Sequence, residues 1–446
     1  MEPIQLIALI IFLVTIGLII WGKVDRVGIG IIGVVLMVLF GVMKETEAFM
    51  FVDWNVIAIL FGIWIIAIYF GKTGIPEYLA VIMLMVSRNN IALFLILLGV
   101  ISAFISMFVD NVVVILIMAP AILYVTKKMK LPSFPFIIFI GLSANFMGTA
   151  LLLGDLPPQM LHSVAGIEFP EFIWQMGRPS SFPILTATFM LTAFLFYQFK
   201  FKKMYAGRSI NNTAIGEIAV ANPMEHIKNR KFAAVVMAVF CATILGMALR
   251  PLTGLYLGFI AVSGAFTLVL IMEIFQKKLG NPSFKEVIGE LDWRALLFYV
   301  TLFILVGAIN HVGLIKMIAN SMASYVQGSY ILSATILYWV TALTVGVVEH
   351  DAYILAFLYI IRDLAASANI NPWPLWWTVL WAGTLGSNLT VAGAPALFVA
   401  LNICEKEDSC KIGLKQFFSY TIPFVVITLA ICFVLGLVIW IVPFTL

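Results

Sequence analysis

The chain has 446 residues, of which 63% are hydrophobic and 11% are charged, with a mean hydropathy of +1.10. Soluble domains carry about 25% charged residues, so this composition excludes an ordinary soluble protein and predicts an all-α integral membrane protein. The net charge of +4 says little about partners. We expect a multi-pass protein of the cytoplasmic membrane, with the lipid bilayer as its surroundings and no nucleic acid as a partner.

Apolar segments long enough to cross a bilayer recur along the whole chain. The first lacks the features of a cleaved signal peptide, so we interpret residues 1–26 as an extra N-terminal transmembrane helix. The predicted spans, about ten in all, are 4–22, 27–43, 54–71, 133–166, 182–199, 233–250, 252–275, 293–311, 374–403 and 418–443. With the N-terminus outside, most Lys and Arg residues then fall on the cytoplasmic side, as the positive-inside rule requires.

A constant offset of 239 residues relates the two halves of the chain. Asp53-Trp54 recurs as Asp292-Trp293, Gly74 as Gly313, Asp110 as Glu349, and Gly154 as Gly393. Such a duplication in an apolar chain is typical of a transporter built from two repeats. We therefore predict repeat 1 at 27–199, a cytoplasmic linker with a connecting helix at 200–251, and repeat 2 at 252–446.

Two segments, 91–126 and 330–366, are predicted to be re-entrant hairpins rather than spans. Each has two apolar limbs around a polar tip, Val109-Asp110-Asn111 in one and Glu349-His350-Asp351 in the other. Basic residues flank both ends of the first segment, so it would enter from the cytoplasm. The second would enter from outside, which makes the two repeats inverted.

An interrupted helix follows each hairpin, at 133–166 and at 374–403. The first carries Asn145, Gly148-Thr149 and Gly154-Asp155, and the second carries Ser387-Asn388, Thr390 and Gly393. Gly and Pro inside an apolar helix free backbone groups, which membrane proteins tolerate mainly where the gap lines a cavity.

At these motifs the chain resembles the ion transporter superfamily, and within it the arsenical pump membrane protein and citrate transporter-like family with its NhaD-type sodium/proton antiporter relatives. The resemblance extends over roughly residues 20 to 443. It implies substrate and ion sites near the bilayer midplane, between the hairpin tips and the helix breaks. The chain departs from the family pattern at Asp155-Leu156-Pro157-Pro158-Gln159 and at the tip Glu349-His350-Asp351.

Ion or substrate binding is expected at residues whose oxygens, amides or flexible backbone suit it: Asp110, Asn111, Asn145, Gly148, Thr149, Asp155, Ser387, Asn388, Thr390 and Gly393. Coupling is assigned to Glu349, His350 and Asp351, because adjacent carboxylates in a low-dielectric region do not easily both stay ionised. No cofactor is expected beyond Na⁺ or H⁺ as the coupling ion, and no other metal.

The resulting hypothesis is a secondary active transporter that moves a small ion by alternating access: arsenite, antimonite or another anion, or Na⁺ in exchange for H⁺. A Na⁺- or H⁺-coupled carboxylate transporter is the alternative, mildly disfavoured because no Arg cluster lies near the breaks. An ion channel is the alternative from another class. Motifs of hydrolases, zinc proteases and redox enzymes are absent, so an enzyme is not expected. The sequence is compatible with a homodimer.

Three further expectations concern structure. Asp53 and Asp292 precede Trp at the start of a span and should cap those helices. Residues 76–86 and 313–325 should form amphipathic helices along the membrane. The four tryptophans Trp373, Trp376, Trp377 and Trp381 are interpreted as an interface belt.

Overall fold

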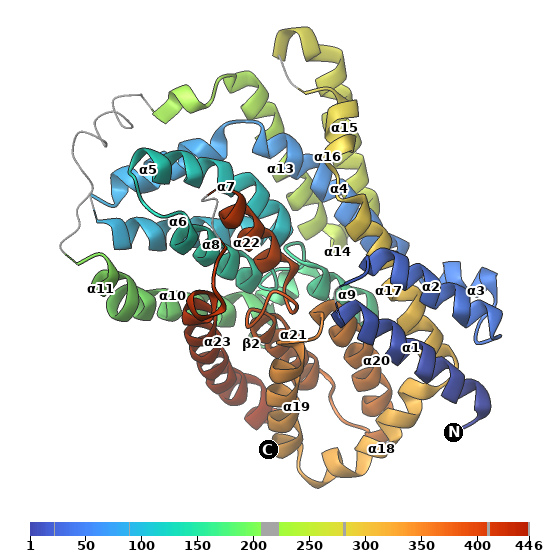
Figure 1. The fold of residues 1–446 in the computed structure, drawn as a ribbon. Coiled ribbons are helices and arrows are strands. Elements are labelled where there is room, and N and C mark those ends of the chain that lie inside the picture. The colour runs from blue at the N-terminus through green and yellow to red at the C-terminus, as the bar shows by residue number, and fades with distance from the viewer. Residues whose placement is uncertain (22, 89, 207–222, 280–281, 408–410, 445–446) are drawn as a thin grey trace.

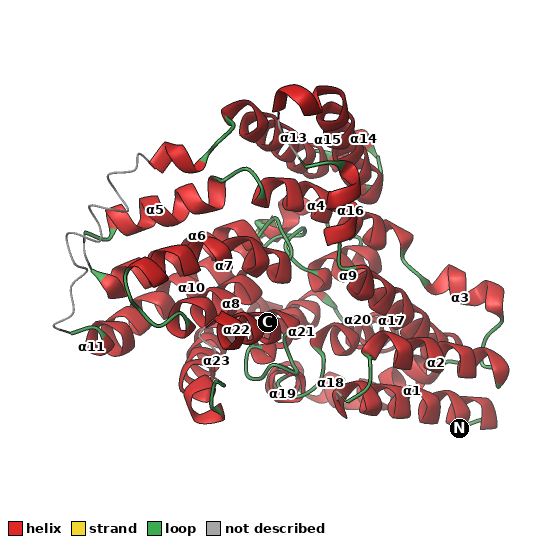
Figure 2. Ribbon diagram, turned by 45° about the horizontal axis from the view of Figure 1, so that its top comes forward, coloured by secondary structure: helices red, strands yellow, loops and turns green. Residues whose placement is uncertain are grey.

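The computed structural model of the chain describes residues 1–446 except 22, 89, 207–222, 280–281, 408–410 and 445–446. It is an all-α membrane protein with one two-stranded antiparallel hairpin, β1 (Trp174–Gln175) and β2 (Arg178–Pro179), in its described part. Figures 1 and 2 show the helices packed in several directions around a centre that contains α8, α9, α21 and α22.

The first half of the chain contains short surface helices as well as membrane helices. In chain order it runs α1 (Pro3–Trp21), α2 (Arg26–Leu39), α3 (Glu45–Phe51), α4 (Trp54–Gly71), α5 (Ile75–Val86), α6 (Ile91–Ser106), α7 (Asn111–Lys128), α8 (Phe134–Met147), α9 (Leu156–Ala165), η1 (Phe169–Phe172), α10 (Ser181–Phe196), η2 (Tyr197–Phe201) and α11 (Lys202–Met204).

The second half begins in the C-terminal part of the predicted linker. It runs η3 (Pro223–His226), α13 (Arg230–Ala248), α14 (Arg250–Thr253), α15 (Leu257–Leu279), α16 (Phe284–Glu290), α17 (Trp293–His311), α18 (Leu314–Gly328), α19 (Tyr330–Val345), α20 (His350–Ala368), α21 (Trp373–Ser387), α22 (Pro395–Glu407), α23 (Leu414–Gly436), η4 (Leu437–Ile441) and η5 (Val442–Phe444). Residues 207–222 of the linker lie outside the described residues.

Eight helices of the described residues are long and apolar enough to cross a membrane. Seven of them coincide with predicted spans, and the eighth is α7, the second limb of the hairpin at 91–126. The predicted span at 27–43 is α2, with 14 residues, and the remaining two are the pairs α8–α9 and α21–α22. Because α7 has the length of a full span, the re-entrant course of its hairpin stays a prediction.

Equivalent elements recur at the offset of 239 residues. Helices α3 to α9 begin where α16 to α22 begin once the offset is added. Local details recur too: Gly74 and Gly313 both have positive φ, at 79° and 78°, and the Trp54 and Trp293 indoles donate to carbonyls five residues earlier. Asp53 and Asp292 accept from the amides of Val56 and Ala295, so both cap their helices as expected.

The two halves pack through contacts between helices of one half and helices of the other. Helix α15 of the second half lies against α4 of the first, and α2 of the first lies against α17 of the second. Helix α9 likewise contacts α20, and α22 contacts α7. Crosswise pairs of this kind are what a two-fold relation between repeats produces. The inverted orientation of the repeats in the membrane stays a prediction.

The structure corrects the expectation that the tryptophans of α21 form a belt at the membrane interface. Trp376, Trp377 and Trp381 are 6%, 0% and 2% exposed, because α21 is enclosed by α8, α19, α20 and α23. The Trp377 indole donates to Gln175 Oε1 and the Trp381 indole to Ser181 Oγ, both at 3.0 Å. These rings hold the protein interior together, and the hydrophobicity of the helix could not distinguish protein neighbours from lipid.

Candidate functional site

The hairpin tips place two carboxylates at helix starts. Asp110 caps α7, and its Oδ1 accepts from the amides of Val112 and Val113 at 3.0 and 3.3 Å. Glu349, its equivalent, caps α20 through the amide of Ala352 at 3.1 Å. The helix dipole and these amides favour negative charge at both positions.

The helix breaks depend on glycine. A Cβ atom at Gly154 would lie well inside van der Waals contact of the Ser106 and Gly148 carbonyl oxygens, and one at Gly393 would meet the Val345 and Ser387 oxygens in the same way. The chain passes this close to the hairpin limbs because no side chain intervenes. Each break thereby brings its polar residues to a hairpin tip.

Asn111 and Asn145 form the centre of a hydrogen-bonded network. Asn111 Nδ2 donates to Asn145 Oδ1 and to Asp155 Oδ2, both at 2.9 Å. Asn145 Nδ2 in turn donates to Ser387 Oγ at 3.0 Å. All four side chains are buried. The network therefore joins the first hairpin tip and both broken helices.

His350 lies near the same oxygen of Asp155, Oδ2, that accepts from Asn111. Its Nδ1 is 3.0 Å from the Gly393 carbonyl oxygen, and because a carbonyl only accepts, Nδ1 carries the proton of this bond. Its Nε2 lies 3.8 Å from Asp155 Oδ2 and 3.4 Å from Asp351 Oδ1. One atom from each of the three residues fits within 4.8 Å of the others, a spacing that suits a bound cation or a shared proton.

Several buried polar atoms at the second hairpin tip and the second helix break have no hydrogen-bond partner within the described residues. Among them are His350 Nε2, Asp351 Oδ1 and both polar atoms of the Asn388 amide. The three side chains are at most 1% exposed. Native proteins leave few buried polar groups unpaired, so these atoms mark a place where an ion or a ligand would complete the site.

Three further predicted site residues make structural contacts around the cluster. Thr149 Oγ1 is 2.6 Å from Thr384 Oγ1, which ties the two breaks together. Thr390 Oγ1 donates to the Gly346 carbonyl at 2.6 Å, and Gly148 packs against Asp155. Thr390 therefore links the second break to the second hairpin.

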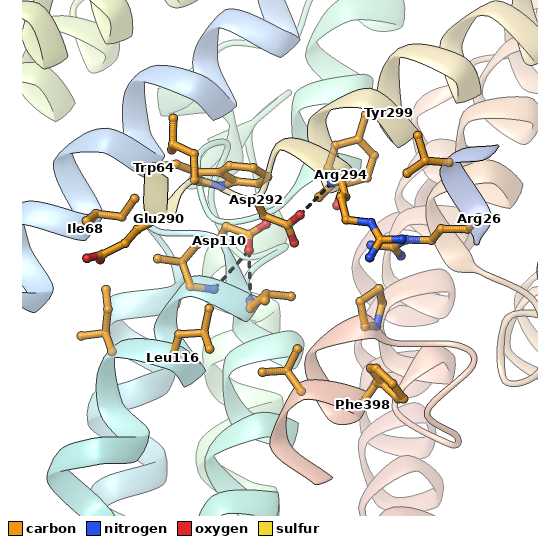
Figure 3. A pocket seen from close by; sticks show the side chains of 18 of the residues that line it. Arg26, Trp64, Ile68, Asp110, Leu116, Glu290, Asp292, Arg294, Tyr299 and Phe398 are labelled. Carbon is orange, nitrogen blue, oxygen red and sulfur yellow. Dashed lines mark hydrogen bonds between the residues drawn. The ribbon is translucent and has the colours of Figure 1, made fainter. Parts of the chain in front are cut away.

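A cavity of about 800 Å³ reaches the hairpin tips from one side. It lies between α2, α4 and α17 on one wall and α7 and α22 on the other. Figure 3 shows Asp110 directed into this space, with Asp292 and Tyr299 facing it from α17 and its N-terminal end. Asp110 and Glu349 line the cavity, whereas Asn111, Asp155, His350, Asp351 and Asn388 lie behind its wall. The structure thus divides the predicted site into a cavity-facing pair and a buried cluster.

Sequence reasoning missed the charges of this cavity. Among the described residues it is lined by three cations, Arg26, Lys72 and Arg294, and by six carboxylates, Asp25, Glu77, Asp110, Glu290, Asp292 and Glu349. Lys72 pairs with Glu290 at 2.5 Å, and Arg294 pairs with Asp25. The repeated Asp-Trp motif at 292–293 could have drawn attention to Asp292, but nothing in the sequence indicated that Asp25 and Arg26 line the same cavity. The basic residues are therefore outnumbered by acidic ones.

Comparison with known proteins gives a consistent result. The family model described as "Citrate transporter" matches residues 16–382. An uncharacterized transporter of Mycobacterium tuberculosis is 26% identical over 91% of this chain and 92% of its own, and a 46 kDa membrane protein of Mycobacterium leprae is 26% identical over 98% of both. The human P protein is 23% identical over 87% of this chain and 54% of its own.

A solved structure has a similar fold. Neisseria gonorrhoeae MtrF, presented as one of a class of antimetabolite efflux pumps, superposes with a TM-score of 0.57 at 13% identity, over 92% of this chain and 84% of that one. At this identity the likeness concerns the fold alone.

Proposed function

The chain belongs to the citrate transporter family, and from this premise we propose that it is a secondary transporter in which a cation and a proton compete for the cluster Asp155, His350 and Asp351. The family match establishes the transporter class, and the relatives' names point the same way. For the solute we propose a small carboxylate anion, on the strength of the family's name.

The observation that carries the coupling proposal is the state of His350. Its Nδ1 donates to the Gly393 carbonyl, so a neutral imidazole turns the lone pair of Nε2 toward Asp155 and Asp351. A cation bound there receives one nitrogen and two carboxylate ligands. A proton on Nε2 gives an imidazolium between the same carboxylates instead. The two occupants exclude each other, and histidine is the side chain that exchanges a proton near neutral pH.

A second candidate is exchange of Na⁺ for H⁺ without an anion. The excess of carboxylates over basic residues in the cavity supports it, because an acidic entrance raises the local concentration of cations. Both candidates share the competition at His350, and the solute distinguishes them.

Thermal unfolding of the purified protein in Na⁺ or choline salts tests the competition. A ligand that binds the folded state stabilises by RT ln(1 + [L]/Kd). We expect Na⁺ to raise Tm at about pH 8.5 and to have little effect at about pH 6, where the proton occupies the site. Asp351→Asn and His350→Gln should remove the Na⁺ effect.

His162→Gln is the matched control, because His162 is also buried and donates to a backbone carbonyl, at Ile167, outside the cluster. It should keep the Na⁺ effect. Proteoliposomes with imposed Na⁺ and pH gradients then separate the candidates: uptake of citrate supports the carboxylate, and proton movement driven by Na⁺ without citrate supports exchange. A Na⁺ effect that survives in both cluster variants would overturn the competition.

A further inference from the structure

The two repeats make different contacts at one pair of equivalent positions. In the first repeat α9 packs against α4. Ser163 of α9 donates to the carboxylate of Asp53, which caps α4. This contact closes the space between the broken helix and the neighbouring long helix.

The equivalent residues of the second repeat are Asn402 of α22 and Asp292, which caps α17. Within the described residues these two side chains form no hydrogen bond with each other, and the large cavity separates their helices. Its walls include Asp292, Ala295 and Tyr299 at the start of α17 and Pro395, Phe398 and Val399 of α22.

Exposure gives the same contrast. Phe398 of α22 is 54% exposed, whereas its equivalent in α9, Gln159, is 1% exposed. An aromatic side chain is thus open to the cavity at the position where the other repeat buries a polar one. The contact with the long helix differs in the same way, since α9 packs against α4 whereas α22 and α17 line opposite walls of the cavity.

The ends of the two helices are also held differently. Glu168, just after α9, pairs with Arg250 beside α13. Its equivalent, Glu407 at the end of α22, pairs with Lys127 at the end of α7 at 2.5 Å. The end of α9 is therefore linked by an ion pair to the region of α13, and the end of α22 is linked by an ion pair to the hairpin limb α7.

The structure has the cavity between α17 and α22 open. We infer that in the other alternating-access state of the transporter Asp292 and Asn402 form the contact that closes this cavity. Helix α22 moves against α17, and the Asn402 amide donates to the Asp292 carboxylate. The Ser163–Asp53 contact opens in the same transition. Because the two contacts join equivalent positions of the repeats, the transition breaks one carboxylate hydrogen bond and forms another, which keeps the two states close in free energy. This inference goes beyond the proposed function, because it is independent of the ion and of the solute.

Disulfide formation between paired cysteines tests the movement, in nanodiscs and in a background with Cys241, Cys404, Cys410 and Cys432 replaced by Ser. The Asp53→Cys/Ser163→Cys pair should form a disulfide rapidly. The Asp292→Cys/Asn402→Cys pair should form one slowly, and several-fold faster when Ser163→Ala weakens the opposite contact. Helices turn about 100° per residue, so the control pair Asp292→Cys/Leu401→Cys should react less.

Three results would overturn the inference. The first is no disulfide at 292/402 in a sample where 53/163 forms readily. The second is a 292/402 rate that Ser163→Ala leaves unchanged. The third is equal reaction of 292/401 and 292/402. Size-exclusion chromatography of each variant before oxidation confirms that it is folded.

Discussion

At the scale of single residues, Asn388 has an incomplete hydrogen-bonding environment. Its amide is buried and neither polar atom has a partner within the described residues, whereas Asn145 in the first break bonds on both sides. A buried unpaired polar group costs about 1–3 kcal/mol. The protein therefore gives up stability at Asn388, which is expected of a group kept free for a ligand.

Substitution separates these two asparagines. Asn388→Ala should keep or raise the Tm of the ion-free protein and remove the Tm rise caused by Na⁺. Asn145→Ala should lower Tm, because it removes the hydrogen bonds that join Asn145 to Asn111 and to Ser387. Differential scanning fluorimetry with and without Na⁺ measures both. A marked loss of ion-free stability in Asn388→Ala would place that residue among the structural ones.

A second residue-level prediction concerns pH. The Gly28 amide and the Arg294 guanidinium hold the pKa of Asp25 below its ordinary value. A carboxylate with a lowered pKa contributes stability above its unfolded pKa and loses it as pH falls through the folded value. The Asp25–Arg294 pair is thus fully formed between about pH 6 and 8.5, and Asp25→Asn should leave the pH profile of transport unchanged. Glu349→Gln with Asp351→Asn should flatten it. Initial rates of transport into proteoliposomes across this pH range measure the profiles of both variants.

The motifs that carry the site could be predicted from the sequence, because Gly, Asn and Asp in apolar segments need a reason to be there. What the sequence could not tell is which of the buried side chains find hydrogen-bond partners. Asn145 and Asn388 lie in the two broken helices, and only the fold of the chain places partners around the first. The Asp25–Arg294 pair was out of reach for the same reason, since it joins residues 269 positions apart.

Among the elements, the breaks of α8–α9 and α21–α22 were predictable from glycine, and their geometry gives a direct test. Gly154→Ala and Gly393→Ala each force a methyl group against backbone oxygens that cannot move away. We expect each to reduce Tm and the yield of folded protein. Gly17→Ala in α1 is the control, because a Cβ there meets nothing within 4 Å. Fluorescence-detected size-exclusion chromatography with heating provides the comparison, and Gly154→Ala behaving like Gly17→Ala would contradict the close approach.

The tryptophans of α21 show where element-level prediction fails. An apolar, aromatic helix has the same composition whether it faces lipid or protein. The polar partners of its indoles, Gln175 and Ser181, lie about 200 positions earlier in the chain, and no local pattern connects them. Amphipathic helices such as α18 were easier, because their polar and apolar faces are written in the segment itself.

For the whole molecule, orientation is the open prediction. The charge distribution places the predicted linker inside and Lys44 outside. In a cysteine-free background, Lys203→Cys and Lys228→Cys should react with an impermeant maleimide only after the cells are permeabilised, and Lys44→Cys should react in intact cells. Labelling of the linker positions in intact cells would contradict the inverted arrangement of the repeats.

The cluster draws its charges unequally from the two halves. Asp155 comes from the first half, and its equivalent in the second is Ala394, while His350 and Asp351 come from the second half, opposite Asn111 and Val112. Two copies of the first half would supply Asp155 without the titratable tip, and two copies of the second half would supply the tip without Asp155. The halves are therefore not interchangeable, because only the fused chain assembles the whole cluster.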